Sequence, residues 1–132
     1  MTGVQTCALR SPPDRARPGL RVLLEAVSAA GAGSFLAVLK RFGPQISRFS
    51  FPMDGFTLAL DFPVSPAALA LMTRLDRITQ DHGGRLYLAK DSRMTAETLR
   101  QTDARADGFA QMRRTAALRP SFTSEQSERL RL

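Results

Sequence analysis

The sequence predicts an α+β chain in which an antiparallel sheet is covered by two helices and followed by a mainly helical C-terminal segment. Two segments alternate apolar and polar residues with a period of two, which indicates half-buried strands, and two others repeat apolar residues at helical spacing. The resulting order of helix, strand, strand, helix and strand, with one more strand expected before it, is that of a split βαβ, ferredoxin-like domain.

Composition excludes several classes of protein. Among the 132 residues, 43% are hydrophobic and 23% are charged, as in an ordinary soluble globular protein. No window approaches the roughly 18 uninterrupted apolar residues of a membrane span, and the N-terminus lacks the pattern of a signal peptide. One cysteine rules out an internal disulfide framework, and no metal-ligand set is predicted.

Residues 1–10, MTGVQTCALR, match no element pattern. They resemble the leader translated from a sequencing adapter, so we expect them to be non-native and to lie outside the fold. The strand expected before the first helix is then predicted to be lost from the start of the chain.

The first helix is predicted over residues 16–30. Leucine and valine recur at helical spacing in this segment and form a stripe suited to covering a sheet. The stripe consists of Leu20, Leu23, Leu24 and Val27. The helix is expected to end at Gly31–Gly33, because glycine accepts the left-handed conformation that helix ends often need.

Residues 34–42 are rich in strand formers and predict the first of two neighbouring strands. The alternation places Lys40 and Phe42 on the same, largely apolar face. Two interpretations of Lys40 stay open. Its stem packs on that face while the ammonium reaches water, or the ammonium binds an anionic group in a cleft.

The second strand is predicted over residues 56–62, after the turn dipeptide Asp54–Gly55. Its buried face is expected to carry Phe56, Leu58, Leu60 and Phe62. Its other face carries Thr57, Ala59 and Asp61. These small and polar side chains leave room for a ligand against the sheet, although a solvent-facing surface would have the same pattern.

A second helix is predicted to begin at Ser65–Pro66, with serine as the cap, and to end at Asp81–Gly84. His82, at the helix C-terminus, is interpreted as structural. A short strand, Arg85–Leu88, follows and leads to Lys90, one of only two lysines among the 19 basic residues. Spacing alone favours a solvated Lys90, and the alternative is that Tyr87 and Lys90 line an active site.

Beyond Lys90 the chain becomes polar and mainly helical, around residues 95–102 and 107–117 with a tail at 122–130. The net charge of +7 raises the hypothesis of nucleic-acid binding. The arginines are scattered, however, and glycine-flanked aromatic motifs and Cys/His fingers are absent from the sequence. The alternative function from another class is a small, basic, ferredoxin-like module that binds RNA or protein.

Three segments carry a resemblance to a known family, in its order and spacing. They are SFLAVLKRFGP at 34–44, the strand from Gly55 that ends LDFP at Pro63, and GGRLYLAKDSR at 83–93. Together they resemble the C-terminal part of FAD-dependent oxidoreductases of the vanillyl-alcohol oxidase superfamily, in particular the oxidases of polyprenylphosphoryl ribose. The resemblance covers roughly residues 12–132.

The resemblance implies a division of the chain and a set of site residues. Residues 11–86 match the C-terminal part of the substrate (cap) domain, and residues 87–132 match the segment that returns to the FAD domain, whose N-terminal part is missing. Tyr87 and Lys90 match cofactor-contacting residues, and Lys90 also matches a catalytic position. The substrate-binding positions are Lys40, Phe42, Thr57, Ala59 and Asp61.

The resemblance also implies a chemistry. A hydroxyl of a polyprenylphosphoryl sugar, or of a related sugar or lactone, is oxidised by hydride transfer to FAD, and a cation beside the ring stabilises the negative charge that develops. An NAD-dependent reductase subunit is the implied partner, and the location is cytoplasmic or peripheral to the membrane. Without the rest of the FAD domain, the fragment is expected to be inactive alone.

Overall fold

The computed structural model describes residues 2–10, 13–116 and 122–132, and it describes side chains from residue 16 onward. The chain divides into two compact units. The first consists of residues 1–45 and 51–91, and the second of residues 46–50 and 92–132. The loop that contains residues 46–50 therefore leaves the first unit and returns to it.

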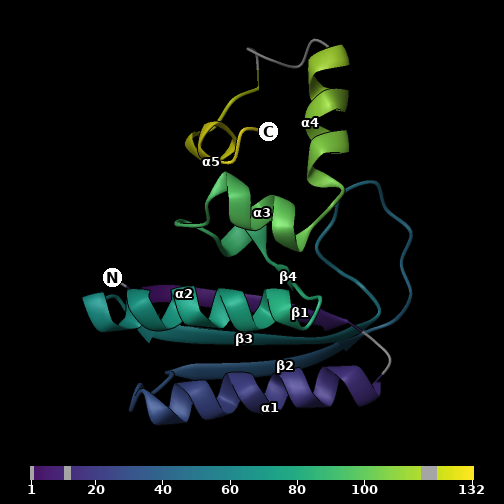
Figure 1. Cartoon of the computed structure of the whole chain (residues 1–132). Coiled ribbons are helices and arrows are strands. Elements are labelled where there is room, and N and C mark those ends of the chain that lie inside the picture. The colour runs from purple at the N-terminus through teal and green to yellow at the C-terminus, as the bar shows by residue number, and fades with distance from the viewer. Residues whose placement is uncertain (1, 11–12, 117–121) are drawn as a thin grey trace. The chain divides into compact units, whose positions relative to one another are not determined.

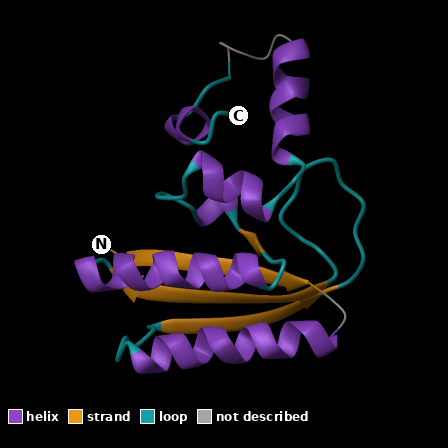
Figure 2. Cartoon of the chain, in the orientation of Figure 1, coloured by secondary structure: helices purple, strands orange, loops and turns teal. Residues whose placement is uncertain are grey.

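The first unit is built on a four-stranded antiparallel sheet, coloured orange in Figure 2. Its strands are β1 (Thr2–Arg10), β2 (Leu36–Phe42), β3 (Gly55–Pro63) and β4 (Arg85–Leu86). They lie in the order β2-β3-β1-β4, and every pair of neighbours is antiparallel. With one helix after β1 and one after β3, this is the βαββαβ order of a ferredoxin-like domain, which confirms the predicted fold class.

Residues 2–10 are part of the sheet, so the prediction that this segment forms no element is wrong. β1 pairs with β3 along its whole length, from Thr2 opposite Pro63 to Arg10 opposite Gly55. On its other edge it pairs with β4 through Cys7 and Ala8. The expected strand before the first helix is therefore present, and the segment interpreted as a leader occupies it. Whether these residues are native stays a prediction.

Two helices, α1 (Pro13–Ala29) and α2 (Pro66–Asp81), cover one face of this sheet (Figure 1). The core lies between the sheet and the helices, and its large buried side chains include Leu23, Leu60, Phe62, Met72 and Leu75. On β3 the predicted burial of Leu58, Leu60 and Phe62 is confirmed, whereas Phe56 is half-buried.

The predicted apolar stripe of α1 needs one correction. Leu23 is buried, but Leu24 is 51% exposed. Successive helical residues point 100° apart, and the buried side of α1 runs through Ala16, Leu23 and Ala26. Leu24 therefore points away from the sheet.

The two ends of α2 carry the helix start and helix end that the sequence predicts. The hydroxyl of Ser65 accepts the backbone N–H of Ala68 at 3.1 Å, which satisfies one of the free donors of the first turn. At the other end His82 is the C-cap, with Nδ1 2.8 Å from the carbonyl oxygen of Ile78. Gly83 follows with φ of +67°, a conformation that suits glycine.

The strand after α2 is shorter than predicted. β4 ends at Leu86, and a short 3-10 helix, η1 (Leu88–Lys90), follows. The backbone N–H of Lys90 donates to Tyr87 and that of Asp91 to Leu88, at 3.2 and 3.1 Å. These local bonds replace the pairing that a continued strand would make with β1.

β2 is an edge strand of the sheet, and much of its apolar surface is exposed. Leu36 and Leu39 are 54% and 58% exposed, and Phe35, just before the strand, is 70% exposed. Arg41, on the face of the sheet that the helices cover, lies over the ring of Phe56 with 5.8 Å to its centroid.

The described residues of the second unit form three helices, α3 (Ala96–Thr102), α4 (Ala106–Thr115) and α5 (Glu125–Arg129). The first two lie on the two predicted helical segments, and α5 lies in the segment for which only a tail was predicted. Ala117, the last residue of the predicted second helical segment, lies outside the described residues. Arg100 links these elements. Its guanidinium donates to the carbonyl oxygens of Leu130 and Arg131 at 3.1 and 3.2 Å, and to the Asp107 carboxylate at 2.7 Å.

Across the described parts of the chain, none of the helices has the length and apolar character that crossing a membrane requires.

Candidate functional site

The five predicted substrate-binding residues lie on one face of the sheet. On β3, Thr57, Ala59 and Asp61 alternate with the buried Leu58 and Leu60, so they lie on the face that the helices leave uncovered. On β2, Lys40 lies directly opposite Thr57. Residues directly opposite each other in an antiparallel pair point to the same face. Phe42, opposite Gly55, therefore shares this face.

Thr57 is the most buried residue of this set. It is 4% exposed, and its Oγ1 has no hydrogen-bond partner in the described part of the chain. The same is true of Oδ1 of Asp54, in the turn before β3. A buried polar group left without a partner costs about 1–3 kcal/mol. Both atoms therefore have hydrogen-bonding capacity that the described structure leaves unused.

The unpartnered hydroxyl predicts an unusual mutational result. Thr57→Val keeps the shape of the side chain and removes a buried polar atom, so we expect the free energy of unfolding to rise by about 1 kcal/mol. Thr79→Val is the matched control, because Thr79 is fully buried but its hydroxyl donates to the carbonyl of Leu75 at 2.8 Å. Denaturant unfolding should show this control variant destabilised. Equal destabilisation of both variants would contradict a free hydroxyl at Thr57.

Lys40 is exposed beside this hydroxyl. Directly opposite residues in an antiparallel pair have Cβ atoms about 4.5–5.5 Å apart. Within the described residues, the ammonium of Lys40 has neither an ion-pair nor a hydrogen-bond partner. An exposed ammonium therefore lies next to a buried hydroxyl that has no partner in the described structure, and both are groups that can donate a hydrogen bond to an oxyanion.

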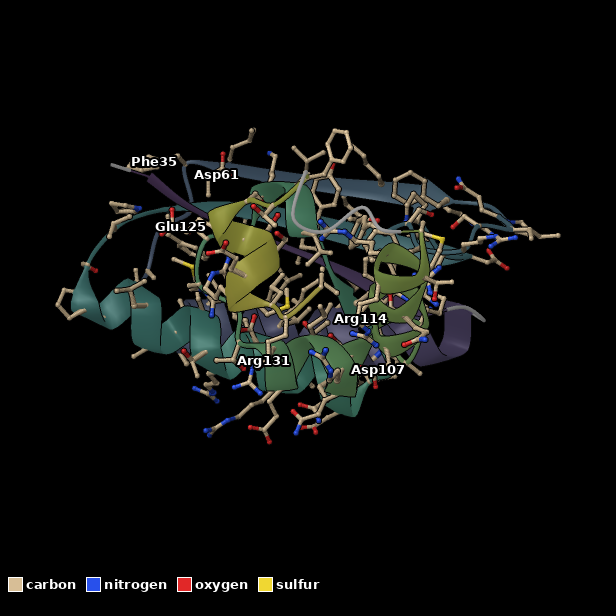
Figure 3. All side chains as sticks on the ribbon, turned by 90° about the horizontal axis from the view of Figure 1, so that it is seen from above. Phe35, Asp61, Asp107, Arg114, Glu125 and Arg131 are labelled. Atoms are coloured by element: carbon tan, nitrogen blue, oxygen red, sulfur yellow. The ribbon has the colours of Figure 1, made fainter. Side chains whose placement is uncertain are left out.

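Asp61 lies at the far end of the same face, where the backbone is held by Ser34. The Asp61 N–H donates to Oγ of Ser34 at 3.1 Å, and the N–H of Phe35 donates to the Asp61 carbonyl at 3.0 Å. Figure 3 shows Phe35 and Asp61 beside each other at this end of the sheet. The carboxylate is half-buried and can accept a hydrogen bond from a hydroxyl group of a ligand.

Tyr87 and Lys90 follow β4, the strand at the opposite edge of the sheet from β2. The Tyr87 ring packs on Phe51, with 4.7 Å between the centroids and 44° between the planes. Lys90 is exposed at the end of η1. Its ammonium also has no side-chain partner among the described residues.

The structure thus brings the sheet residues together and places Tyr87 and Lys90 apart from them. Lys40, Thr57, Ala8 and Arg85 occupy one register line across all four strands. With strands 4.7–4.9 Å apart, this line is roughly 14 Å long. The candidate site is therefore a broad face with cations near both edges rather than a single compact cluster.

Sequence reasoning missed two members of this region, Asp54 and Phe51. Asp54 was interpreted only as a turn residue, and its carboxylate oxygen is buried without a partner in the described structure. Phe51 packs on Tyr87 although 36 positions separate them in the sequence. The local sequence signals only an aromatic residue three positions before the turn residue Asp54.

No group of three or more histidine, cysteine, aspartate and glutamate residues suited to a metal ion occurs among the residues that the structure describes.

Several arginines of the second unit are bound internally. Arg100 donates to three backbone carbonyls, and Arg105 donates to two. Arg113 and Arg129 donate to the carbonyls of Phe122 and Met94. These guanidinium groups stabilise the fold, which weakens the link between the +7 charge and nucleic-acid binding.

Comparison with known proteins identifies homologues. The chain is 37% identical over 121 residues, 91% of its length, to decaprenylphosphoryl-beta-D-ribose oxidase of Mycolicibacterium smegmatis. It is 38% identical over 117 residues, 86% of its length, to an uncharacterized protein in the mprA 5' region of Streptomyces coelicolor. It spans 26% of the first protein and 31% of the second. No family model matches the chain.

These similarities confirm the resemblance that the sequence predicts. They cover nearly the whole chain and only a part of each relative.

Proposed function

From its kinship with decaprenylphosphoryl-beta-D-ribose oxidase, we propose that this chain is part of an FAD-dependent oxidoreductase of the vanillyl-alcohol oxidase superfamily. The reaction is oxidation of a sugar hydroxyl, and the substrate is a polyprenylphosphoryl ribose or a related sugar. Lys40 opposite the unpartnered, buried hydroxyl of Thr57 is the observation that carries the proposal.

The sheet face suits a phosphorylated sugar. The Lys40 ammonium offers a positive charge to the phosphate, and the Thr57 hydroxyl offers a hydrogen bond to it or to the sugar. At the other end of the face, the Asp61 carboxylate accepts a hydrogen bond from a sugar hydroxyl. Ala59 and Phe42 supply apolar surface for the carbon atoms of the substrate.

The residues after β4 fit a flavin. Tyr87 presents a half-buried aromatic ring that Phe51 supports from one side, and Lys90 presents an ammonium free of ion pairs in the described structure. FAD, when bound, accepts a hydride from the sugar carbon. Tyr87 would contact the cofactor, and Lys90 would supply positive charge beside it.

The proposed assignment of domains gives the sheet face to the substrate and the segment from Tyr87 onward to the flavin domain. An NAD-dependent reductase subunit is the proposed partner, as the resemblance implies. The alternative of a basic RNA-binding module has less support, because arginines of the second unit bind backbone carbonyls.

The substrate assignment is tested by Lys40→Ala in the FAD-loaded flavoenzyme that contains this chain. We expect substrate affinity to fall by about tenfold or more, because a charge-assisted hydrogen bond to phosphate contributes roughly 1.5–3 kcal/mol. The measurement is anaerobic flavin reduction against the concentration of a polyprenylphosphoryl pentose.

Two variants serve as controls. Arg74→Ala removes an equally exposed positive charge from α2, which packs on the opposite face of the sheet, and should leave affinity unchanged. Lys40→Arg should retain most of it. Failure of the wild-type protein to reduce flavin with this substrate, or an equal loss in Arg74→Ala and Lys40→Ala, contradicts the assignment.

A further inference from the structure

Helix α5, in the second unit, ends in a turn that places an arginine in an unfavourable backbone conformation. Leu130 is the C-cap, and Arg131 after it has φ of +55°, the one positive φ of a residue other than glycine in the described part of the chain. The N–H of Arg131 donates to the Glu128 carbonyl at 3.1 Å, and that of Leu132 donates to the Ser127 carbonyl at 2.9 Å. This is the pattern of a Schellman motif, whose left-handed position is usually glycine.

Packing explains this turn but not the arginine in it. Leu130 and Leu132, on either side, are 0% and 5% exposed, so the turn buries both leucines and leaves Arg131 exposed. Glycine would form the same turn without the steric penalty that a Cβ carries in this conformation. A strained residue type that the backbone does not require points to a function of its side chain.

Arg100 of α3 fixes the backbone of the same turn. Its guanidinium donates to the carbonyl oxygens of Leu130 and Arg131 at 3.1 and 3.2 Å. It also donates to the carbonyl oxygen of Ala96 at 3.0 Å and, through Nε, to the Asp107 carboxylate at 2.7 Å. Arg131 is therefore held at both its N–H and its carbonyl, which sets the direction in which its side chain leaves the backbone.

The Arg131 side chain borders a hollow beside α3, which we term the Arg131 hollow. It has a volume of about 460 Å³ and is lined by Ala96, Glu97, Arg100, Gln101 and Arg131, all in the second unit. The Glu97 carboxylate accepts a hydrogen bond from the Gln101 amide at 3.1 Å, and Arg100 forms an ion pair with Asp107. Among the described residues, the Arg131 guanidinium has neither an ion-pair nor a hydrogen-bond partner. Its five N–H donors are therefore unused in the described structure.

We propose that the Arg131 hollow binds a small ligand through an oxyanion, a phosphate or carboxylate group, that Arg131 holds. The planar guanidinium presents two parallel N–H donors, which match two oxygens of such a group. The Glu97 carboxylate can accept a hydrogen bond from a hydroxyl or amine elsewhere on the ligand. This site goes beyond the proposed function and is independent of it, because every residue that it needs lies in the second unit.

Inorganic phosphate is the probe that tests the site in the full chain. Titration at constant ionic strength, followed by ¹H–¹⁵N NMR, should shift the backbone amides of residues 96–101 and 127–132 along one saturable curve. Sodium acetate, titrated in the same way, distinguishes the two sources of the oxyanion. A response to phosphate at the lower concentration assigns a phosphorylated ligand, and a response to acetate at the lower concentration assigns a carboxylate.

Arg131→Gly is the decisive variant. It removes the guanidinium and adopts a positive φ without strain, so we expect the Kd for phosphate to rise by about tenfold or more. The midpoint of thermal unfolding should stay unchanged or rise. Arg131→Lys keeps the charge but loses the planar pair of donors, and should bind phosphate more weakly than the wild type. Arg114→Ala is the matched control, because it removes one exposed arginine of α4 that does not line the hollow.

A loss of the phosphate response in Arg131→Gly, with affinity retained in Arg114→Ala, supports the site. The proposal is overturned by an equal loss in both variants, by wild-type affinity in Arg131→Gly, or by the lack of a localised response in the wild type. A thermal midpoint that falls in Arg131→Gly would show that the arginine stabilises the fold. That result would overturn the assignment of its strained conformation to ligand binding.

Discussion

Replacing Lys90 with alanine is expected to slow reduction of the flavin by about 100-fold or more in the proposed enzyme. Loss of one preorganised electrostatic contact in an active site typically has an effect of this size. Lys90 is exposed and its ammonium has no side-chain partner in the described structure. The stability of the variant should therefore stay within about 0.5 kcal/mol of the wild type.

The measurement is single-turnover reduction under anaerobic conditions, followed by flavin absorbance. Lys90→Arg is the control that keeps a positive charge, and it should retain much of the rate. A Lys90→Ala enzyme that reduces its flavin at the wild-type rate would remove Lys90 from the proposed mechanism. A loss of rate together with a loss of bound FAD would instead assign it to cofactor binding.

The second large effect concerns stability. Phe62→Ala is expected to lower the free energy of unfolding by about 3–5 kcal/mol, because it leaves a cavity in a packed core. Phe62 is 0% exposed on the helix-covered face of β3. Since small domains have total stabilities of about 5–15 kcal/mol, this variant would lose a large part of the total.

Denaturant unfolding followed by far-ultraviolet circular dichroism measures this change. Phe35→Ala is the matched control, because Phe35 is 70% exposed in the same unit and its backbone bond to Asp61 survives the substitution. We expect its effect to stay within about 0.5 kcal/mol. Equal effects of the two variants would show that the core does not lie on the helix-covered face of the sheet.

Periodicity predicted the elements that have a strong pattern of their own. β3 alternates over its whole length, and α2 has a serine cap at one end and glycine at the other. β1 was missed because its residues carry no such pattern. A central strand is selected by its neighbours, and β1 has partners on both edges, in β3 and β4.

The length of β4 was also beyond sequence reasoning. The Leu-Tyr-Leu run has the composition of a strand, yet the backbone after Leu86 forms a 3-10 turn. Both conformations satisfy the backbone donors and acceptors. Their difference in energy depends on packing that the local sequence does not contain.

For the candidate site, too, the sequence pattern predicted part of the arrangement. A period of two places Thr57, Ala59 and Asp61 on one face, and antiparallel pairing adds Lys40. The burial of Thr57 without a hydrogen-bond partner was not predictable, since it depends on residues that are distant in sequence. The contacts of Phe51 with Tyr87 and of Arg105 with the β2–β3 loop are non-local for the same reason.

The exposed β2 edge has a consequence for handling the protein. An edge strand of seven residues with exposed Leu36 and Leu39 is a template for pairing with a second molecule. Lys40 and Arg41 are the charged residues in this strand that oppose such self-association. Substitutions of Lys40 by neutral residues therefore risk fibrillar or amorphous aggregation, and light scattering should accompany every affinity measurement on them.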